Sequence, residues 1–190
     1  MKQLKKAYTI FTAALIAITL SSCSSDDDNG EPPVSNHTYE FKLISDQQTI
    51  ELSGSVIRDA GSTDVLAIHV GAESHDLDYD SIVMQLFDGN IAIQSGFLLN
   101  SSQQPLPLSF EGYGEGTHSL LSITPGSSTS VPLVATSGSA TLSNLQFFSD
   151  PSVPESHVSF TMNFEGVFFD VSNEITYQGT GKVVIQPFSY

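Results

Sequence analysis

The sequence predicts an all-β fold, an antiparallel β-sandwich of the immunoglobulin-like or jelly-roll-like kind, with a β-barrel as the alternative. Apolar residues recur at every second position through most of residues 37–190, which is the period of a half-buried strand. No window after residue 36 has the i, i+3, i+4, i+7 apolar spacing of an amphipathic helix. The strand-like runs recur roughly every 10–15 residues, with turn residues between them.

The first half of this region supplies five of the expected strands. Tyr39, Phe41 and Leu43 alternate with charged residues, and similar stripes follow at residues 50–56 and 82–86. The nearly continuous apolar run Val65–Val70 is typical of a strand buried on both faces. Asp88-Gly89, between the stripe that ends at residue 86 and the one that begins at residue 91, predicts a hairpin with a tight turn.

The C-terminal third has the clearest alternation. Residues 158–164 place apolar side chains on one face and polar ones on the other, and residues 171–173 predict a turn into a returning strand at 175–185. Gly179 and Gly181 interrupt that strand and predict a bulge or bend. The segments 96–107 and 125–131 are rich in Ser, Gln, Pro and Gly, and we expect them to be loops.

The charge balance limits the partners. The 190-residue chain has 21 acidic and 6 basic residues, and three of the basic residues lie within its first six positions. Such a surface repels nucleic acid and anionic lipid headgroups. It could attract divalent cations or basic partners, but solubility through self-repulsion is the preferred explanation.

The N-terminus has the organisation of a secretory signal peptide. Lys2, Lys5 and Lys6 precede a 14-residue apolar run at 7–20, which is shorter than the roughly 20 residues that a membrane span needs. The small residues Ser21 and Ser22 follow, and then Cys23, which is the only cysteine, so no disulfide can form within the chain. We therefore expect a signal peptide at 1–22, an acidic flexible tether at 23–36 and a β-domain at 37–190.

Leu20-Ser21-Ser22-Cys23 resembles the lipobox of bacterial lipoproteins. The resemblance implies that the leader is removed before Cys23, and that this cysteine carries a diacylglycerol and an acylated amine. Several acyl chains would anchor the protein stably, because each buried methylene contributes about 0.8 kcal/mol. The expected partner of the N-terminus is thus a membrane.

The next five residues are Ser24, Ser25, Asp26, Asp27 and Asp28. They resemble the acidic export signal that follows the lipid cysteine in surface lipoproteins of the Bacteroidota. The resemblance implies a place in the outer membrane, lipid-anchored and facing the cell exterior. A solvated acidic linker on a periplasm-facing anchor is the alternative.

A second resemblance concerns the C-terminal half. The segment Gly112–Thr117 and the glycine-punctuated stretches 164–166 and 178–181 are similar to parts of small Bacteroidota β-sandwich lipoproteins of unknown function. His118 departs from that pattern, which usually has an aromatic residue there. The resemblance favours a β-sandwich and implies no activity.

The best candidate for metal binding is the acidic stretch that contains Asp76, Asp78 and Asp80. Alternating carboxylates offer the hard oxygen ligands that Ca²⁺ prefers. The EF-hand template does not fit, because Ser81 stands where it has glycine and Phe87 where it has glutamate. A solvated acidic loop is the alternative, so Ca²⁺ is the one cofactor that we consider.

Catalytic patterns are weak. The five histidines are scattered, and no Gly-x-Ser-x-Gly motif occurs. Glu111 and Glu115 flank a glycine-rich turn, and nothing in the sequence places them across a cleft as a glycosidase would require. We therefore expect no catalytic residues, with a hydrolase of surface glycans as the alternative.

Aromatic residues give the last candidates. Most of the 12 phenylalanines alternate with polar residues and indicate core, whereas Tyr79 and Tyr113 lie in expected loops and are candidates for ligand contact. The sequence thus predicts a non-enzymatic cell-surface lipoprotein, which acts as a binding, adhesion or structural accessory module. Its ligand would be a protein or a glycan and not nucleic acid. A Ca²⁺-binding module and a glycan hydrolase are the alternatives.

Overall fold

The computed structural model describes residues 36–57, 64–72, 78–109, 119–126, 131–148 and 156–187. Every regular element within these ranges is a strand, and the strands pair antiparallel in the order β2-β1-β10-β9-β3-β4-β5-β7-β8-β6, with a further pairing of β9 with β8. The prediction of an all-β fold is confirmed. The expected signal peptide and nearly all of the expected tether lie outside the described residues.

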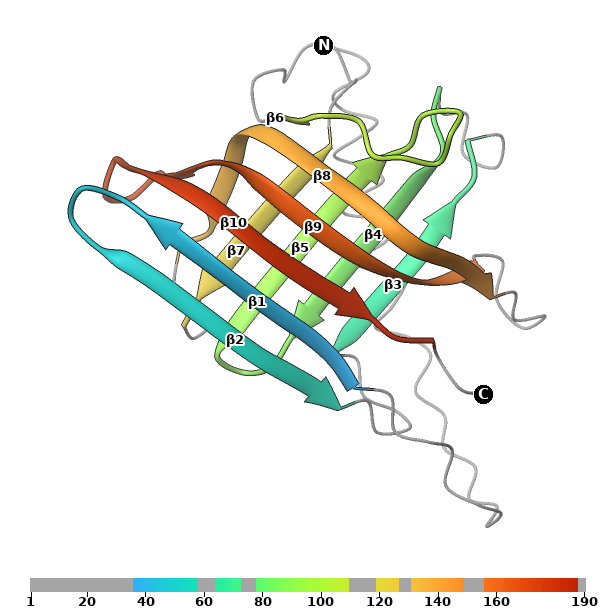
Figure 1. Cartoon of the computed structure of the whole chain (residues 1–190), viewed down its shortest axis with the longest axis horizontal. Helices are drawn as coiled ribbons and strands as arrows, with labels where there is room; N and C mark the ends of the chain where they lie inside the picture. Colours follow the sequence, from blue (N-terminus) through green and yellow to red (C-terminus); the bar gives the residue numbers. More distant parts are fainter. Residues whose placement is uncertain are drawn as a thin grey trace.

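The strands form two layers (Figure 1). The front layer contains, in spatial order, β2 (Thr49–Ile57), β1 (Asn36–Ile44), β10 (Ile175–Ile185), β9 (Ser156–Asp170) and β8 (Leu133–Phe148). The two-residue strand β6 (Leu108–Ser109) pairs with the free side of β8. The strands of the front layer run diagonally across those of the layer behind it in Figure 1.

The back layer contains β3 (Val65–Val70), β4 (Ser81–Phe87), β5 (Ile91–Leu98) and β7 (Leu120–Pro125). Two corners join it to the front layer. At one corner β7 pairs with the first residues of β8, and at the other β3 pairs with the first residues of β9. Because β8 and β9 also pair with each other, the ladder closes through β9, β3, β4, β5, β7 and β8. The fold thus combines the layers of a sandwich with the closure of a barrel.

The core lies between the layers and follows the alternation of the sequence. In β1 every second side chain is buried, and Phe97, Phe160 and Phe168 are almost completely inaccessible to solvent. These rings confirm that the alternating phenylalanines are core residues. Phe147, with 39% of its surface exposed near the end of β8, is an exception.

The hairpin predicted at Asp88-Gly89 joins β4 to β5. The Asp88 carboxylate accepts hydrogen bonds from the backbone N–H groups of Asn90 and Ile91, at 2.9 Å each. Gly89 follows with φ of 82°, a left-handed conformation that favours glycine. The turn is thus determined by local residues, which is why the sequence predicts it.

The turn predicted at 171–173 joins β9 to β10 in the same way. Asp170 is buried, and hydrogen bonds from the Asn173 side chain and from the backbone of Asn173 and Ser172 lower the pKa of its carboxyl group despite that burial. The carboxylate therefore stabilises the turn above its unfolded pKa of about 4, and this contribution is lost as the pH falls through the folded value.

Three sequence expectations need correction. The run Val65–Val70 is β3, but Leu66 and Ile68 are only partly buried, because they lie on the outer side of the back layer. The segment 96–107 is not a loop throughout, since β5 continues to Leu98 before the irregular stretch begins. Pro125, expected at the start of a loop, is the last residue of β7.

The glycines of β10 have a different role from the one predicted. β10 pairs with β9 over its whole length without a register shift, so Gly179 and Gly181 mark no bulge. A Cβ atom at Gly181 would meet the side chains of Phe164 and Phe41, and one at Gly179 would meet Leu43. Both glycines are needed because core side chains from neighbouring strands lie over them.

We expect Gly181→Ala to destabilise the protein by about 2 kcal/mol, because the added methyl group overpacks the core. Thr180→Ala is the matched control, since Thr180 is exposed at the adjacent position of β10. Its effect should stay within about 0.5 kcal/mol. Urea unfolding of the two variants and the wild type checks this prediction, and equal stabilities would contradict it.

Candidate ligand-binding face

The outer face of the front layer carries rows of polar side chains that come from all five strands. One row contains Ser53, Glu40, Lys182, Asn163 and Thr141, which are in register from β2 to β8. All five are exposed. Side chains that are directly opposite on neighbouring strands lie about 5 Å apart. The row therefore presents hydroxyl, carboxylate, ammonium and amide groups at regular spacing.

A second row lies beside the first and contains Glu51, Lys42, Thr180, Glu165 and Ser139. The Lys42 Nζ atom lies 2.5 Å from Glu51 Oε1, and both side chains are at least half exposed. The two charges neutralise each other at the surface. Hydroxyl groups and paired charges thus leave this part of a strongly acidic protein close to neutral.

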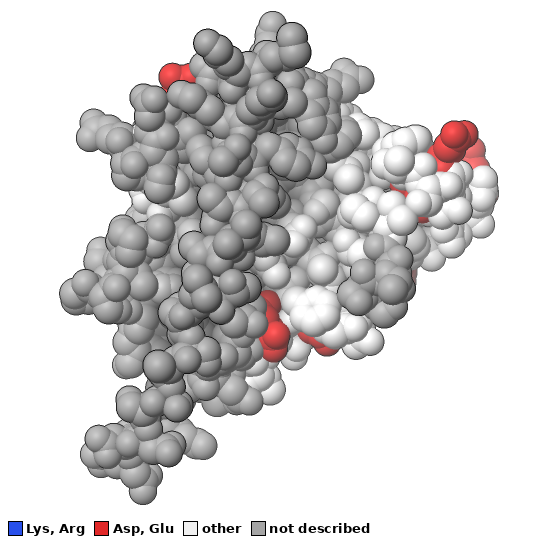
Figure 2. Space-filling view, turned by 180° about the vertical axis from the view of Figure 1, so that it is seen from behind, with Lys and Arg blue, Asp and Glu red and all other residues white. Residues whose placement is uncertain are grey.

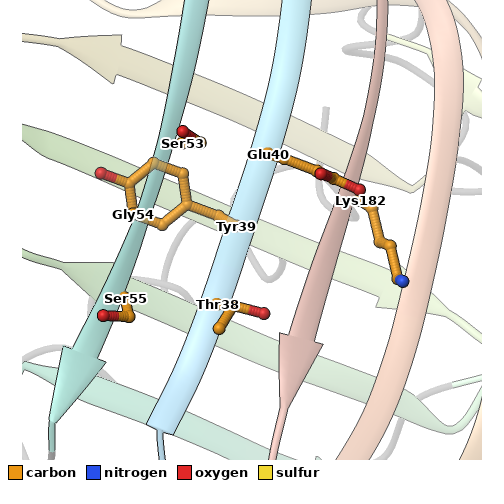
Figure 3. A pocket seen from close by; sticks show the side chains of 7 residues that line it. All are labelled: Thr38, Tyr39, Glu40, Ser53, Gly54, Ser55 and Lys182. Carbon is orange, nitrogen blue, oxygen red and sulfur yellow. The ribbon is translucent and has the colours of Figure 1, made fainter.

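A shallow depression of about 390 Å³ lies on this face near its β2 edge. Figure 3 shows the residues that line it, which come from β1, β2 and β10. They are Thr38, Tyr39, Glu40, Ser53, Gly54, Ser55 and Lys182. The depression is bordered mainly by hydroxyl groups, with one carboxylate and one ammonium group.

The described ranges contain two lysines, Lys42 and Lys182, and no arginine. Both lysines lie on this outer face. The opposite side of the molecule differs. Figure 2 shows acidic residues among the described part of that surface and no basic ones. The cationic groups of the described domain are therefore gathered on the front layer.

Tyr39 fixes the position of this face relative to the back layer. Its side chain is buried, lies across Gly54 (Figure 3), and its hydroxyl donates a hydrogen bond to the Asp88 carboxylate in the β4–β5 turn. A Cβ atom on Gly54 would collide with the tyrosine ring. Burial, and then the Asp88 carboxylate, raise the pKa of the Tyr39 hydroxyl above its ordinary value of 10.0.

The predicted calcium ligands are only partly described. Asp76 lies outside the described residues, while Asp78 and Asp80 precede β4 and are exposed. The Asp80 carboxylate accepts the backbone N–H of Ala72 at 2.8 Å, and its other oxygen lies 3.6 Å from His69 Nε2. Within the described ranges no three acidic, histidine or cysteine side chains form a group that could hold a metal ion.

The histidines of the described strands have structural contacts. His69 lies in β3 and packs edge-on against Phe147, with 5.0 Å between the ring centroids. His37 is fully buried in β1, and its Nδ1 atom accepts the backbone N–H of Gln186 at 3.2 Å. His37 is thus a hydrogen-bonded sheet residue, whereas His69 is held by its contacts with Phe147 and Asp80.

Most of the remaining candidates from the sequence lie outside the described residues. Tyr79 is half-buried just before β4, whereas its proposed counterpart Tyr113 lies outside the described residues. Cys23, the segment 24–28, Glu111 and Glu115 also lie outside them.

The polar face is not among the features that the sequence predicts. Its signal is present in the even-numbered polar residues of 36–42 and 176–182. Alternation alone identifies which residues of one strand share a face, but not which strands are neighbours. The rows appear only once the register across the five strands is known.

We expect Tyr39→Phe to lower the free energy of unfolding at pH 7 by about 1 kcal/mol, because the hydrogen bond to Asp88 is lost. The folded-state pKa of Tyr39 is raised, so the hydroxyl contributes its stabilisation fully below pH 10, and this contribution falls as the pH rises toward the folded value. The advantage of the wild type over Tyr39→Phe should therefore disappear by about pH 11. Urea unfolding of both proteins at pH 7 and pH 11 measures it, and a constant difference would contradict the prediction.

Comparison with known proteins gives no relative. No family model, no curated protein and no solved structure matches this chain. In the part of the chain that the structure describes, no helix is long and apolar enough to cross a membrane.

Proposed function

We propose that the chain is a lipid-anchored protein of the bacterial cell surface and that its β-domain is a non-enzymatic binding module. The contact surface would be the outer face of the front layer. The observation that carries the proposal is the register of this face, which places Ser53, Glu40, Lys182 and Asn163 in one row across four strands.

The chemistry of the face favours a polar ligand. Hydroxyl and amide groups both donate and accept hydrogen bonds, and a carboxylate beside an ammonium group fixes the orientation of a ligand that has donors and acceptors. Polyhydroxylated glycans have this character along their whole length. We therefore propose a glycan as the ligand.

The rigidity of the face supports binding. All five strands belong to one sheet. The hydroxyl of Tyr39, on β1 beside the β2 edge, donates a hydrogen bond to Asp88 in the β4–β5 turn of the back layer. Side chains on regular strands are held in place before a ligand arrives, so less conformational entropy is lost on binding. A surface made of mobile loops would lack this advantage.

The anchor explains how the face would meet its ligand. If Cys23 is lipidated, residues 23–36 separate the membrane from the first strand, and 14 extended residues span at most about 50 Å. The composition of this segment is acidic and poor in apolar residues, which suits a flexible tether. The domain would then reach ligands beyond the lipid headgroups.

We expect Cys23→Ala to release the protein from the membrane, because the thiol that accepts the lipid is gone. In cells that express the full chain, the wild type should sediment with the outer membrane and have a mass increased by its acyl chains. Alanine at position 23 should shift most of the protein to the soluble fraction. Wild-type protein with an unmodified Cys23 and its leader attached would refute the anchor.

We expect Glu40→Ala combined with Lys182→Ala to weaken glycan binding at least tenfold, since two charge-assisted contacts each contribute about 1–2 kcal/mol. Affinity electrophoresis of the full chain in gels that contain mannan, xylan or dextran measures the effect. Asp64→Asn, just before β3, is the control for charge removal away from the face. Equal retardation of the double variant and the wild type, or retardation of neither, would contradict the proposed face.

A further inference from the structure

The two edges of the front layer differ in a way that points to a partner. At one edge, β8 is paired with β7 at its start and with β6 further along. At the other edge, β2 pairs with β1, and within the described residues no strand pairs with its outer side. Figure 1 shows β2 as the outermost strand of the layer. β2 therefore presents a row of backbone N–H and C=O groups outward.

β2 lacks the features that usually protect an edge strand. Natural edges are short, bulged, or interrupted by proline or by unpaired lysine. β2 is nine residues long, pairs with β1 without a register shift, and has the sequence TIELSGSVI. Its one charged residue, Glu51, is already paired with Lys42. The strand is thus long, regular and close to neutral, in a chain whose formal net charge is −15.

We propose that β2 pairs antiparallel with β2 of a second copy of this chain, about a two-fold axis at Ser53. This interface goes beyond the proposed function and does not depend on it. The two-fold arrangement places Ser53 opposite itself and extends each front layer into the other. The backbone groups of both edges are then satisfied by each other.

The sequence of β2 is complementary to itself in this register. On the inner face, the half-buried Ile50 meets Val56 of the second copy, and Leu52 meets Gly54. These contacts cover Ile50 and Leu52, which the single chain leaves partly exposed, whereas Val56 is already buried.

The charges on the outer face also favour a second copy. Glu51 meets Ser55 of the second copy, so the two glutamates are not opposite each other. Like charges that are directly opposite would destabilise the pair. Because the two-fold axis is perpendicular to the sheet, both outer faces lie on the same side. The two polar faces then form one continuous surface.

The register provides a test that depends on the sign of a charge. Ser55→Glu places a carboxylate opposite Glu51 twice in each dimer, whereas Ser55→Lys places an ammonium group there. We expect the wild-type full chain to dimerise at micromolar concentrations in sedimentation equilibrium. The dissociation constant should rise about fivefold or more in Ser55→Glu and fall by a similar factor in Ser55→Lys.

Thr141→Glu is the matched control, because Thr141 is exposed on the same face and opposite the uncharged Asn163, but lies on β8, far from the β2 edge in strand order. Its dissociation constant should equal that of the wild type. A monomer at all concentrations up to 200 µM would overturn the proposal. A dimer that responds equally to both changes at Ser55, or to neither, would overturn it as well.

Cross-linking checks the axis independently. In a full chain with Cys23→Ser, Ser53→Cys should form a disulfide-linked dimer on mild oxidation, because residue 53 is opposite itself. Ser55→Cys should not, since the two copies of residue 55 are four positions apart in the ladder. Cross-linking at 55 and not at 53 would contradict the register. These measurements need neither a glycan nor a lipid, so their failure is distinguishable from failure of the proposed function.

Discussion

The long ladder between β8 and β9 is the interaction on which the rest of the structure depends. Leu133 of β8 is paired with Asp170 of β9, and Phe148 with His157, so each strand begins where the other ends. The first residues of each strand also pair with the back layer on their other side. Those of β8 pair with β7, and those of β9 pair with β3. Two register shifts, between Ala135 and Ser137 and between Ser143 and Gln146, lie near these two corners. Extra residues at such positions bend a strand, which lets one ladder serve both layers.

Close packing against this ladder requires small residues at particular places. Gly138, Gly166 and Gly179 are in register across β8, β9 and β10. At Gly138 and Gly166 a Cβ atom would meet the backbone of the opposite strand, whereas at Gly179 it would meet Phe168 and Leu43. The backbones therefore approach each other closely, and core side chains fill the space that the missing side chains leave. Glycine in a strand usually weakens it, and here the packing of aromatic and aliphatic groups offsets that cost.

The same layer that encloses the core on one side presents the polar rows on the other. Glu40 is exposed between two buried residues and Lys182 is exposed beside the buried Val183, so their positions are fixed by the packing beneath them. Tyr39 connects this architecture to the back layer through Asp88, 49 residues away in the chain. A rigid polar face suits the binding role that we propose, and the unprotected edge at β2 suggests that the face is extended by a second copy. Both ideas use features of one layer, but they rest on different groups, namely side chains for the ligand and backbone for the dimer.

The sequence by itself determined the all-β class, the alternation that selects the core phenylalanines, and the turns at Asp88-Gly89 and 171–173, because each depends on residues that are near each other in the chain. It also suggests a lipid anchor at Cys23. It did not identify β8, from Leu133 to Phe148, because the apolar alternation of this run is interrupted at its two register shifts; the run is a strand because β9 pairs along it. Nor did it show that Gly181 accommodates Phe164 and Phe41, or that Glu40 and Lys182 share a row. Only the tertiary structure decided these points, since register and neighbouring strands are set by contacts between residues far apart in sequence.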